Sequence, residues 1–421
     1  MNVEAPEEAM NIPTTAELPF SATGASTRTL PHDLVPLDST QRRLMNRVKL
    51  VPVVDIEDFR FRAVVDWIEF RVHLGRTTQA QHVQQILRRH LPRDSFIRPE
   101  DEGPGSTFSI CSIRVQEPAN LALIARVHRD LTGTFGEAAG SRVAAIEISV
   151  DATPRQPSDN MRTTLLGAMQ RTIWTGRDIW SNPSSRPRTF GGNRQMERLI
   201  PPPREEALEK RLKRDNEVPS ALVPGHHRAP FVDGTMYLGA RDGDDVMIRI
   251  MDKVKDRQRP DGTFDDLPGD QKRVRIEATL KGIELLTLGI TDVPSLRRTK
   301  LASMKKRYFQ FRLPSFSSDD SSRGAANVMR NAKQVWRART YLRTGIVGLM
   351  AMDREAAELR KTMLPGLRRT MRAQKQVKQR TWVGKRLEPS FVSWEEMNRK
   401  VDVAFRQLVK REQTAWKRMK P

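Results

Sequence analysis

The chain has 421 residues and a formal net charge of +22, from 73 Lys and Arg against 51 Asp and Glu. This excess favours a polyanionic partner, because each cation placed against a phosphate releases condensed counterions. No stretch has the roughly 20 apolar residues of a spanning helix, and the single cysteine, Cys111, excludes an internal disulfide or a thiolate metal cluster. We predict a soluble cytoplasmic protein with no membrane partner, and we place Cys111 in a strand core.

The first half of the chain predicts a leader followed by an α+β layer. Residues 1–58 carry Pro, Thr, Ser and Glu without sustained apolar periodicity, which predicts a disordered or loosely attached leader. Strands are predicted over 61–74, 107–115 and 142–151, with helices beginning near Thr77 and Pro118. This alternation is typical of an antiparallel or mixed sheet with helices on one face.

The α+β domain is predicted to extend over residues 59–312. Within it, residues 152–230 resemble an insertion, because stretches of Pro, Ser, Asn and Arg surround one short helical pattern near 161–173. Three further strands are predicted over 235–239, 246–252 and 273–280, with a helix after Gly282 and another after Pro294. The first two strands should form a hairpin, because Asp-Gly at 242–243 favours a tight turn.

Residues 321–421 predict a basic helical region. They contain 25 Lys and Arg against 8 Asp and Glu, so most of the net charge lies here. We predict a DNA-binding region with core anchors at Trp336, Trp382, Trp394 and Trp416; the alternative is a set of solvated helix faces. The predicted phosphate contacts are Arg368, Arg369, Arg372, Lys375, Lys378, Arg380, Lys385 and Arg386.

Three short motifs follow one another in the second half of the predicted domain. They are Tyr237-Leu-Gly-Ala-Arg241, Arg249-Ile-Met-Asp-Lys253 and Arg275-Ile-Glu277. The block resembles the replication initiation factor family, the Rep_trans type of plasmid and phage rolling-circle initiators and related conjugative relaxases. That family has Tyr-x-Gly-Ser-Arg, Arg-x-Tyr-(Asp/Glu)-Lys and Arg-x-Glu strands, so this chain departs from it at Ala240 and Met251.

The resemblance extends more weakly to the segments 65–70 and 146–151 and covers roughly residues 60–310. It implies a bacterial protein that nicks and rejoins one DNA strand, at an origin or nick site in single-stranded or cruciform form. The chain has no Walker-type phosphate-binding motif, so a host helicase is an expected partner. Replication initiator and conjugative relaxase share this chemistry, and we favour the initiator. The alternative is a catalytically silent nucleic-acid-binding protein; a homodimer is left open.

Tyr237 is the predicted nucleophile. Only three tyrosines occur in the chain, and this one alone lies among glycines, arginines and acids. A phenolate that attacks phosphorus leaves a 5′-phosphotyrosine and a free 3′-hydroxyl. A hairpin centred on Gly243 places Arg249 opposite Tyr237, beside the attacked phosphate. Arg241 is a further candidate phosphate contact, or an exposed turn charge; the alternative for Tyr237 is a strand aromatic that packs inward.

Acidic residues on two strands predict a metal site. Strand alternation puts Glu147 and Asp151 on one face, and Glu277 could complete an oxygen-ligand set for Mg²⁺ or Mn²⁺. The alternative is structural salt bridging with arginines. Asp66 and Asp252 share faces with apolar neighbours, which favours a buried hydrogen-bonded role unless a strand bulges.

Two further groups complete the predicted site. Arg275 and Lys253 are assigned to DNA binding. His226 and His227 are adjacent, so in a strand they would point to opposite faces, and an ordinary loop pair is favoured over a metal or phosphate role.

Overall fold

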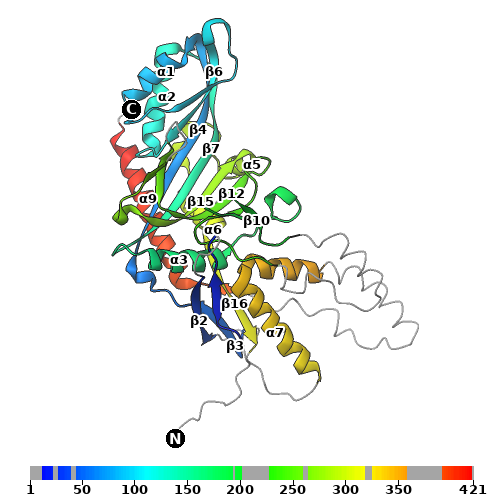
Figure 1. The fold of residues 1–421 in the computed structure, drawn as a ribbon. Coiled ribbons are helices and arrows are strands. Elements are labelled where there is room, and N and C mark those ends of the chain that lie inside the picture. Colours follow the sequence, from blue (N-terminus) through cyan, green and yellow to red (C-terminus); the bar gives the residue numbers. More distant parts are fainter. Residues whose placement is uncertain are drawn as a thin grey trace, which may run out of the picture.

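Two antiparallel sheets organise the computed structural model, which describes residues 12–21, 27–38, 44–192, 195–201, 227–258, 264–317, 325–357 and 391–419. The larger sheet has nine strands in these ranges, and its central strands carry the candidate site (Figure 1). Its strands, in spatial order, are β10 (Met196–Arg198), β9 (Arg188–Phe190), β11 (Thr235–Leu238), β12 (Val246–Lys253), β15 (Arg273–Lys281), β7 (Glu137–Pro154), β4 (Phe59–Gln79), β6 (Thr107–Gln116) and β5 (Phe96–Pro99).

Helices cover the apolar face of this sheet, as predicted for an α+β fold. The helices α1 (Ala80–Arg88) and α2 (Leu121–Phe135) lie over β4 and β6, while α3 (Asp159–Thr172) crosses β12, β15 and β7 (Figure 1). Every second residue of β7 from Ile146 to Ala152 is fully buried on that face. Cys111 of β6 is fully buried, which confirms its predicted place in a strand core.

The second sheet contains strands from both ends of the chain. It consists of β1 (Thr15–Leu18), β2 (Arg28–Pro36), β3 (Arg47–Pro52), β16 (Gln310–Ser317) and β17 (Phe391–Ser393), with β8 (Ile173–Trp174) also paired to β16. Both sheets contribute to one continuous hydrophobic core. A short ribbon, β13 (Lys255–Gln258) with β14 (Phe264–Asp266), stands apart from them.

The N-terminal strands contradict the predicted disordered leader. Leu18, Leu30 and Leu50 are fully buried, one from each strand. Leu18 packs so closely on α3 that a Cβ at Gly167 would lie 2.5 Å from its methyl group. The strands were missed because each is short and its apolar positions are separated by Pro, Thr and Glu, which hides the alternation.

We expect Leu30→Ala to lower the free energy of unfolding by about 2–5 kcal/mol, since it removes a fully buried side chain and leaves a cavity. Urea denaturation followed by circular dichroism measures this change. A change below about 0.5 kcal/mol, the range of ordinary surface substitutions, would support the disordered leader instead.

The predicted insertion is also part of the fold. Its strand β8 pairs with β16 in the smaller sheet, and its strands β9 and β10 form the edge of the larger sheet beside β11. The segment is therefore part of both sheets rather than an interruption of the domain. The two remaining short helices of the domain, α5 (Gly282–Thr287) and α6 (Leu301–Tyr308), begin after Gly282 and Pro294 as predicted.

The C-terminal helices pack onto the α+β domain. The helix α9 (Glu395–Arg418) lies along β4, whose residues 59–65 pair with β7 but have no second strand neighbour among the described residues. The helix α7 (Ala325–Thr344) lies beside the smaller sheet (Figure 1). Strand β17 lies between them in sequence, so the region is not all-helical as predicted.

Two of the four predicted tryptophan anchors lie in the core. Trp394 is buried and Trp416 packs against the core, but Trp336 is 40% exposed and is not an anchor. Trp382 lies outside the described residues.

No helix within the described ranges is long and apolar enough to cross a membrane.

Candidate active site

The hairpin β11–β12 has the register that the sequence predicts. Tyr237 pairs with Arg249, but a loop over residues 239–245, with bends at 241–243, joins the strands in place of the predicted tight turn. Gly239 and Gly243 have φ of +92° and +93°, a conformation that glycine adopts at little cost. At Gly239 a Cβ would also lie 2.4 Å from the carbonyl oxygen of Val246, so glycine is required where the strand ends.

A row of polar side chains crosses four strands on the face opposite α3. Arg188 of β9 pairs with Tyr237, Tyr237 with Arg249, and Arg249 with Glu277 of β15. Directly paired residues in an antiparallel sheet share one face, so these four side chains form a continuous line. The line brings a phenol, two guanidinium groups and a carboxylate together.

Tyr237 lies on this face with its ring partly exposed. The ring packs edge-on against Phe190, with centroids 5.3 Å apart, and the guanidinium carbon of Arg188 lies 5.1 Å from its centroid. A cation over an aromatic face is attracted to the ring and would also stabilise a phenolate.

The other two tyrosines are unsuited to nucleophilic attack. Tyr308 and Tyr341 are both almost fully buried. Burial raises the pKa of Tyr341, while burial and a hydrogen bond donated to Glu284 raise the pKa of Tyr308. Their phenols therefore stay protonated and out of contact with solvent, which leaves Tyr237 as the accessible phenol.

Three buried carboxylates gather at the inner end of the polar row. Asp66, Glu147 and Glu277 each offer an oxygen, and these oxygens lie within 4.8 Å of one another. We call them the acidic trio. Carboxylate oxygens at this spacing fit the hard-ligand preference of Mg²⁺ or Mn²⁺. Burial raises the pKa of Glu277 to about 7, with the neighbouring acids adding to the effect and Arg249 opposing it.

Asp66 joins the trio because β4 bulges there. The register between β4 and β7 shifts between Val65 and Trp67, so two residues of β4 fall where one would fit. The carbonyl of Asp66 accepts a hydrogen bond from the Glu117 amide at 2.6 Å instead of continuing the ladder. The bulge turns Asp66 from the apolar face to the polar one.

Donors around Glu147 fix its position. Trp67 Nε1 donates to Glu147 Oε1 at 2.7 Å, and the Thr279 hydroxyl donates to Oε2. Arg249 Nη2 lies 2.9 Å from Glu147 Oε1 and 2.5 Å from Glu277 Oε2, and its side chain keeps 27% exposure. Arg249 therefore links Tyr237 to the trio from the open side.

Asp151 lies outside the acidic trio, in contrast to the predicted ligand set. Arg275 binds it through two hydrogen bonds, from Nε at 2.5 Å and from Nη2 at 2.8 Å, and Arg273 Nε lies 3.1 Å away. Its oxygens are thus held by guanidinium groups. The salt-bridge alternative describes Asp151, whereas Glu147 and Glu277 lie together as predicted.

Arg275 is buried rather than exposed at the surface. Its side chain is 2% exposed and also contacts Asp66 and Glu277. Burial opposes its charge, but the hydrogen bonds and charges of the surrounding acids outweigh that effect and raise its pKa. Strand alternation identified the face of Arg275 but not the depth at which it lies, and its role in DNA binding stays a prediction.

The remaining predicted residues lie away from the trio or outside the described ranges. Arg241 is an exposed turn residue, and Lys253 pairs with Asp256 at 3.3 Å. Asp252 is bound by Arg162 of α3 at 2.9 Å on the apolar face, as its alternation predicted. His227 is buried and lines a separate cavity with Trp336; His226 is not described. The predicted phosphate contacts between 368 and 386 also lie outside the described residues.

Arg188 and Phe190 are site residues that the sequence did not reveal. They come from a three-residue strand in the segment interpreted as an insertion, where nothing in the pattern indicates pairing with Tyr237. Trp67 lies in the segment 65–70 and was assigned no role from the sequence. A buried tryptophan beside two acids in that block was the available clue.

We expect Arg188→Met to lower the rate of any reaction at Tyr237 by about 10²–10³-fold, the loss typical of removing one charge-stabilising donor. Arg241→Met removes an equal charge from the exposed turn and should change the rate less than threefold. Single-turnover kinetics of DNA cleavage measure both variants. Equal losses in the two variants would show that Arg188 contributes only general positive charge.

Comparisons with known proteins do not assign this chain to a family. No family model matches it, and no curated protein matches it. Among solved structures, it matches the rolling circle replication initiator protein from Geobacillus stearothermophilus, with 10% sequence identity, covering 68% of this chain and 98% of that one. The TM-score is 0.27, which is too low to support a shared fold or a shared activity.

Proposed function

We propose that this protein is a metal-dependent DNA strand transferase that nicks and rejoins one DNA strand through Tyr237, in the manner of a rolling-circle replication initiator. The observation that carries the proposal is the line Arg188, Tyr237, Arg249 and Glu277 across four strands, which ends in the acidic trio. Together these residues offer a nucleophile, cations for the attacked phosphate and ligands for a divalent ion.

The chemistry is a transesterification at phosphorus. The phenolic oxygen of Tyr237 loses its proton and attacks a phosphodiester, and the bond from phosphorus to the 3′ oxygen breaks. The 3′ oxygen takes up a proton, and the 5′-phosphate stays on the tyrosine. Attack by a 3′-hydroxyl reverses the step and rejoins the strand, so the energy of the broken bond is retained.

The arginines and the acidic trio have separate tasks in this proposal. Arg188 and Arg249 lie on either side of Tyr237, where they neutralise negative charge on the transition state. Asp66, Glu147 and Glu277 would hold Mg²⁺ or Mn²⁺. Such an ion polarises a phosphoryl oxygen and stabilises developing negative charge.

Conversion of supercoiled plasmid DNA, or cleavage within a pool of single-stranded oligonucleotides, tests the activity. We expect a nick that requires Mg²⁺ or Mn²⁺ and leaves protein on the 5′ end after denaturation. Cleavage without attached protein would point to hydrolysis instead, and a gel shift without cleavage would contradict the enzymatic proposal.

A second candidate function is a nucleic-acid-binding protein without catalysis. It is favoured by the ion pairs of the trio, because Arg249 and Arg275 already balance two of its three negative charges. In this alternative the acids and arginines only stabilise the sheet, and the absence of nicking with either metal ion would identify it.

Within the proposed function, a relaxase would use the same residues, and an initiator remains our preference. Because the sequence has no Walker-type motif, the proposal includes a separate helicase from the host.

The basic segment 368–386 is proposed to contribute phosphate contacts. We expect replacement of Arg368, Arg369, Arg372 and Lys375 with Gln to weaken duplex binding and to reduce the slope of log K against log[salt] by about 0.9 for each lost phosphate contact. Fluorescence anisotropy at several salt concentrations measures this slope. Unchanged affinity and slope would remove this segment from the DNA-binding surface.

A further inference from the structure

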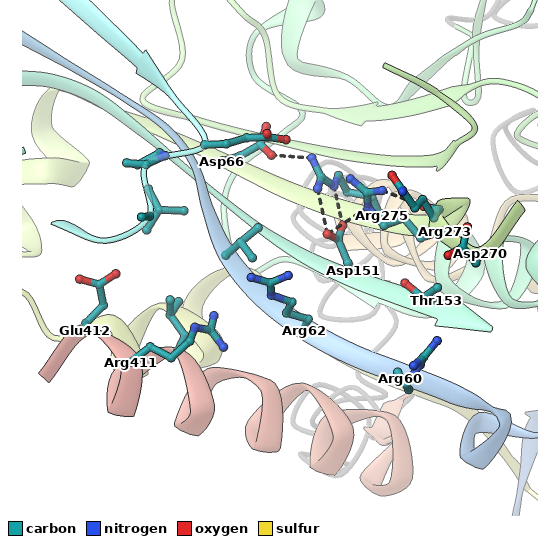
Figure 2. Close-up of a pocket in the computed structure, with 17 residues that line it drawn as sticks. Arg60, Arg62, Asp66, Asp151, Thr153, Asp270, Arg273, Arg275, Arg411 and Glu412 are labelled. Carbon is teal, nitrogen blue, oxygen red and sulfur yellow. Dashed lines mark hydrogen bonds and ion pairs between the residues drawn. The ribbon is translucent and has the colours of Figure 1, made fainter. Parts of the chain in front are cut away.

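A cleft of about 610 Å³ opens between β4 and α9, next to the acidic trio. Figure 2 shows its residues: Arg60 and Arg62 rise from β4, Arg411 comes from α9, and Arg273 from β15. Asp66 lines the same cleft and is hydrogen-bonded to Arg275 (Figure 2). The cleft therefore reaches the acidic trio at Asp66, and arginines from three elements line it.

Two arginines of this cleft have no partner of opposite charge among the described residues. Arg60 and Arg62 have no hydrogen bond or ion pair to any part of the chain that the structure describes. The residue paired with Arg62 across the sheet is Asp151, but Arg275 and Arg273 already bind its carboxylate. An anion from outside would supply the missing partner.

Arg62 and Arg411 also repel each other. Burial lowers the pKa of Arg411, the nearby charge of Arg62 lowers it further, and the charge of Glu412 opposes both effects. Arg411 is held at the cleft because its guanidinium donates to the Ala63 carbonyl on the open edge of β4. Two like charges kept together at a cost to stability are typical of a binding site for a negatively charged group.

Among the described acids around the cleft, Glu412 partly offsets Arg411, but none pairs with Arg60 or Arg62. Glu412 accepts a hydrogen bond from the Leu121 amide at 2.8 Å, and Glu117 pairs with Arg93 at 3.3 Å. Asp270 is exposed at the rim. A diester backbone fits this arrangement, because guanidinium groups bind phosphate oxygens in pairs.

We propose that this cleft binds the sugar–phosphate backbone of single-stranded DNA and leads the strand to the acidic trio. The proposal rests on the proposed nicking function for the fate of the strand, but not for its binding. A single strand is favoured over a duplex because the cleft has the volume of a small-molecule site, roughly 300–1,000 Å³, which admits a short stretch of one strand.

Binding is tested in a Tyr237→Phe background with EDTA, so that neither the nucleophile nor a metal ion contributes. A labelled oligothymidylate is titrated by fluorescence anisotropy against Arg62→Gln and Arg62→Gln/Arg411→Gln. We expect the double variant to bind at least tenfold more weakly, with a salt slope lower by about 0.7 for each lost contact. The control, Arg406→Gln, removes an exposed arginine of α9 that pairs with Asp402, and should stay within twofold.

A thermal melt without DNA provides the second readout. Since Arg62 repels Arg411 and has no acidic partner, Arg62→Gln should raise the melting temperature while it weakens DNA binding. A lower melting temperature together with unchanged affinity would overturn the proposal, as would equal losses of affinity in Arg62→Gln and Arg406→Gln. Tighter binding of duplex through the same arginines would also overturn it.

The two proposals fail in different ways. Cleft-dependent binding without any nicking by the unmodified chain would refute the nicking function alone. Nicking that is insensitive to Arg62→Gln/Arg411→Gln would refute the cleft alone.

Discussion

Tyr237→Phe should abolish both nicking and the covalent protein–DNA adduct. The variant keeps the ring that packs on Phe190 and lies under Arg188, and it loses only the attacking oxygen. We expect a loss on the order of 10⁴-fold or more, the scale seen when a covalent nucleophile is removed. DNA affinity should stay within twofold, because the change removes one hydroxyl group and leaves the cations of the site in place.

Tyr308→Phe is the matched control. It removes a hydroxyl that donates to Glu284 in the core, so it should cost about 1 kcal/mol of stability and leave nicking intact. Denaturing gel electrophoresis of labelled DNA detects the adduct in both variants. Full nicking by Tyr237→Phe would move the nucleophile to another residue.

Removal of one member of the acidic trio should weaken binding of the metal ion. Asp66→Asn or Glu147→Gln preserves the shape of the side chain but leaves two carboxylates for the ion. We expect Mn²⁺ affinity, measured by calorimetry without DNA, to fall at least tenfold, and metal-dependent nicking to fall by on the order of 10²-fold or more.

Two further variants test whether the acidic trio, rather than a set that includes Asp151, holds the metal ion. Asp151→Asn should lose stability, because Arg275 and Arg273 lose a partner, but should keep Mn²⁺ affinity within about threefold. Arg249→Met removes a cation from the trio and should tighten Mn²⁺ binding. If Asp151→Asn loses Mn²⁺ while Asp66→Asn retains it, the ligands are those that strand alternation alone predicts.

Much of the sheet could be predicted because local rules determine it. The hairpin is centred near Gly243, so Tyr237 lies opposite Arg249 as the sequence indicates. Alternation likewise places Glu147 and Asp151 on the polar face of β7. Neither result needs knowledge of the rest of the chain.

The errors have a common physical origin in long-range packing. Asp66 reaches the trio through a bulge, and a bulge reverses the alternation on which the prediction depends. Arg188 pairs with Tyr237 across 49 residues of sequence, from a strand too short to show a pattern. Asp151 lies on the face of the sheet that a metal ligand would need, but the buried Arg275 binds its carboxylate.

The same holds at the two ends of the chain. The strand Arg28–Pro36 pairs with β3, and β3 pairs in turn with β16, which begins at residue 310. Because its neighbours come from the other end of the chain, its own sequence shows little of its structure. Trp336 lies on a helix but faces solvent, and residue type alone does not distinguish an anchor from an exposed aromatic.

The most direct test of the central claim is the identity of the residue that becomes attached to DNA. The protein is incubated with single-stranded DNA and Mn²⁺, digested with protease and nuclease, and analysed by mass spectrometry. The account predicts a nucleotide phosphate on the peptide that contains Tyr237. A nucleotide on any other residue, or cleaved DNA without a modified peptide, would contradict it.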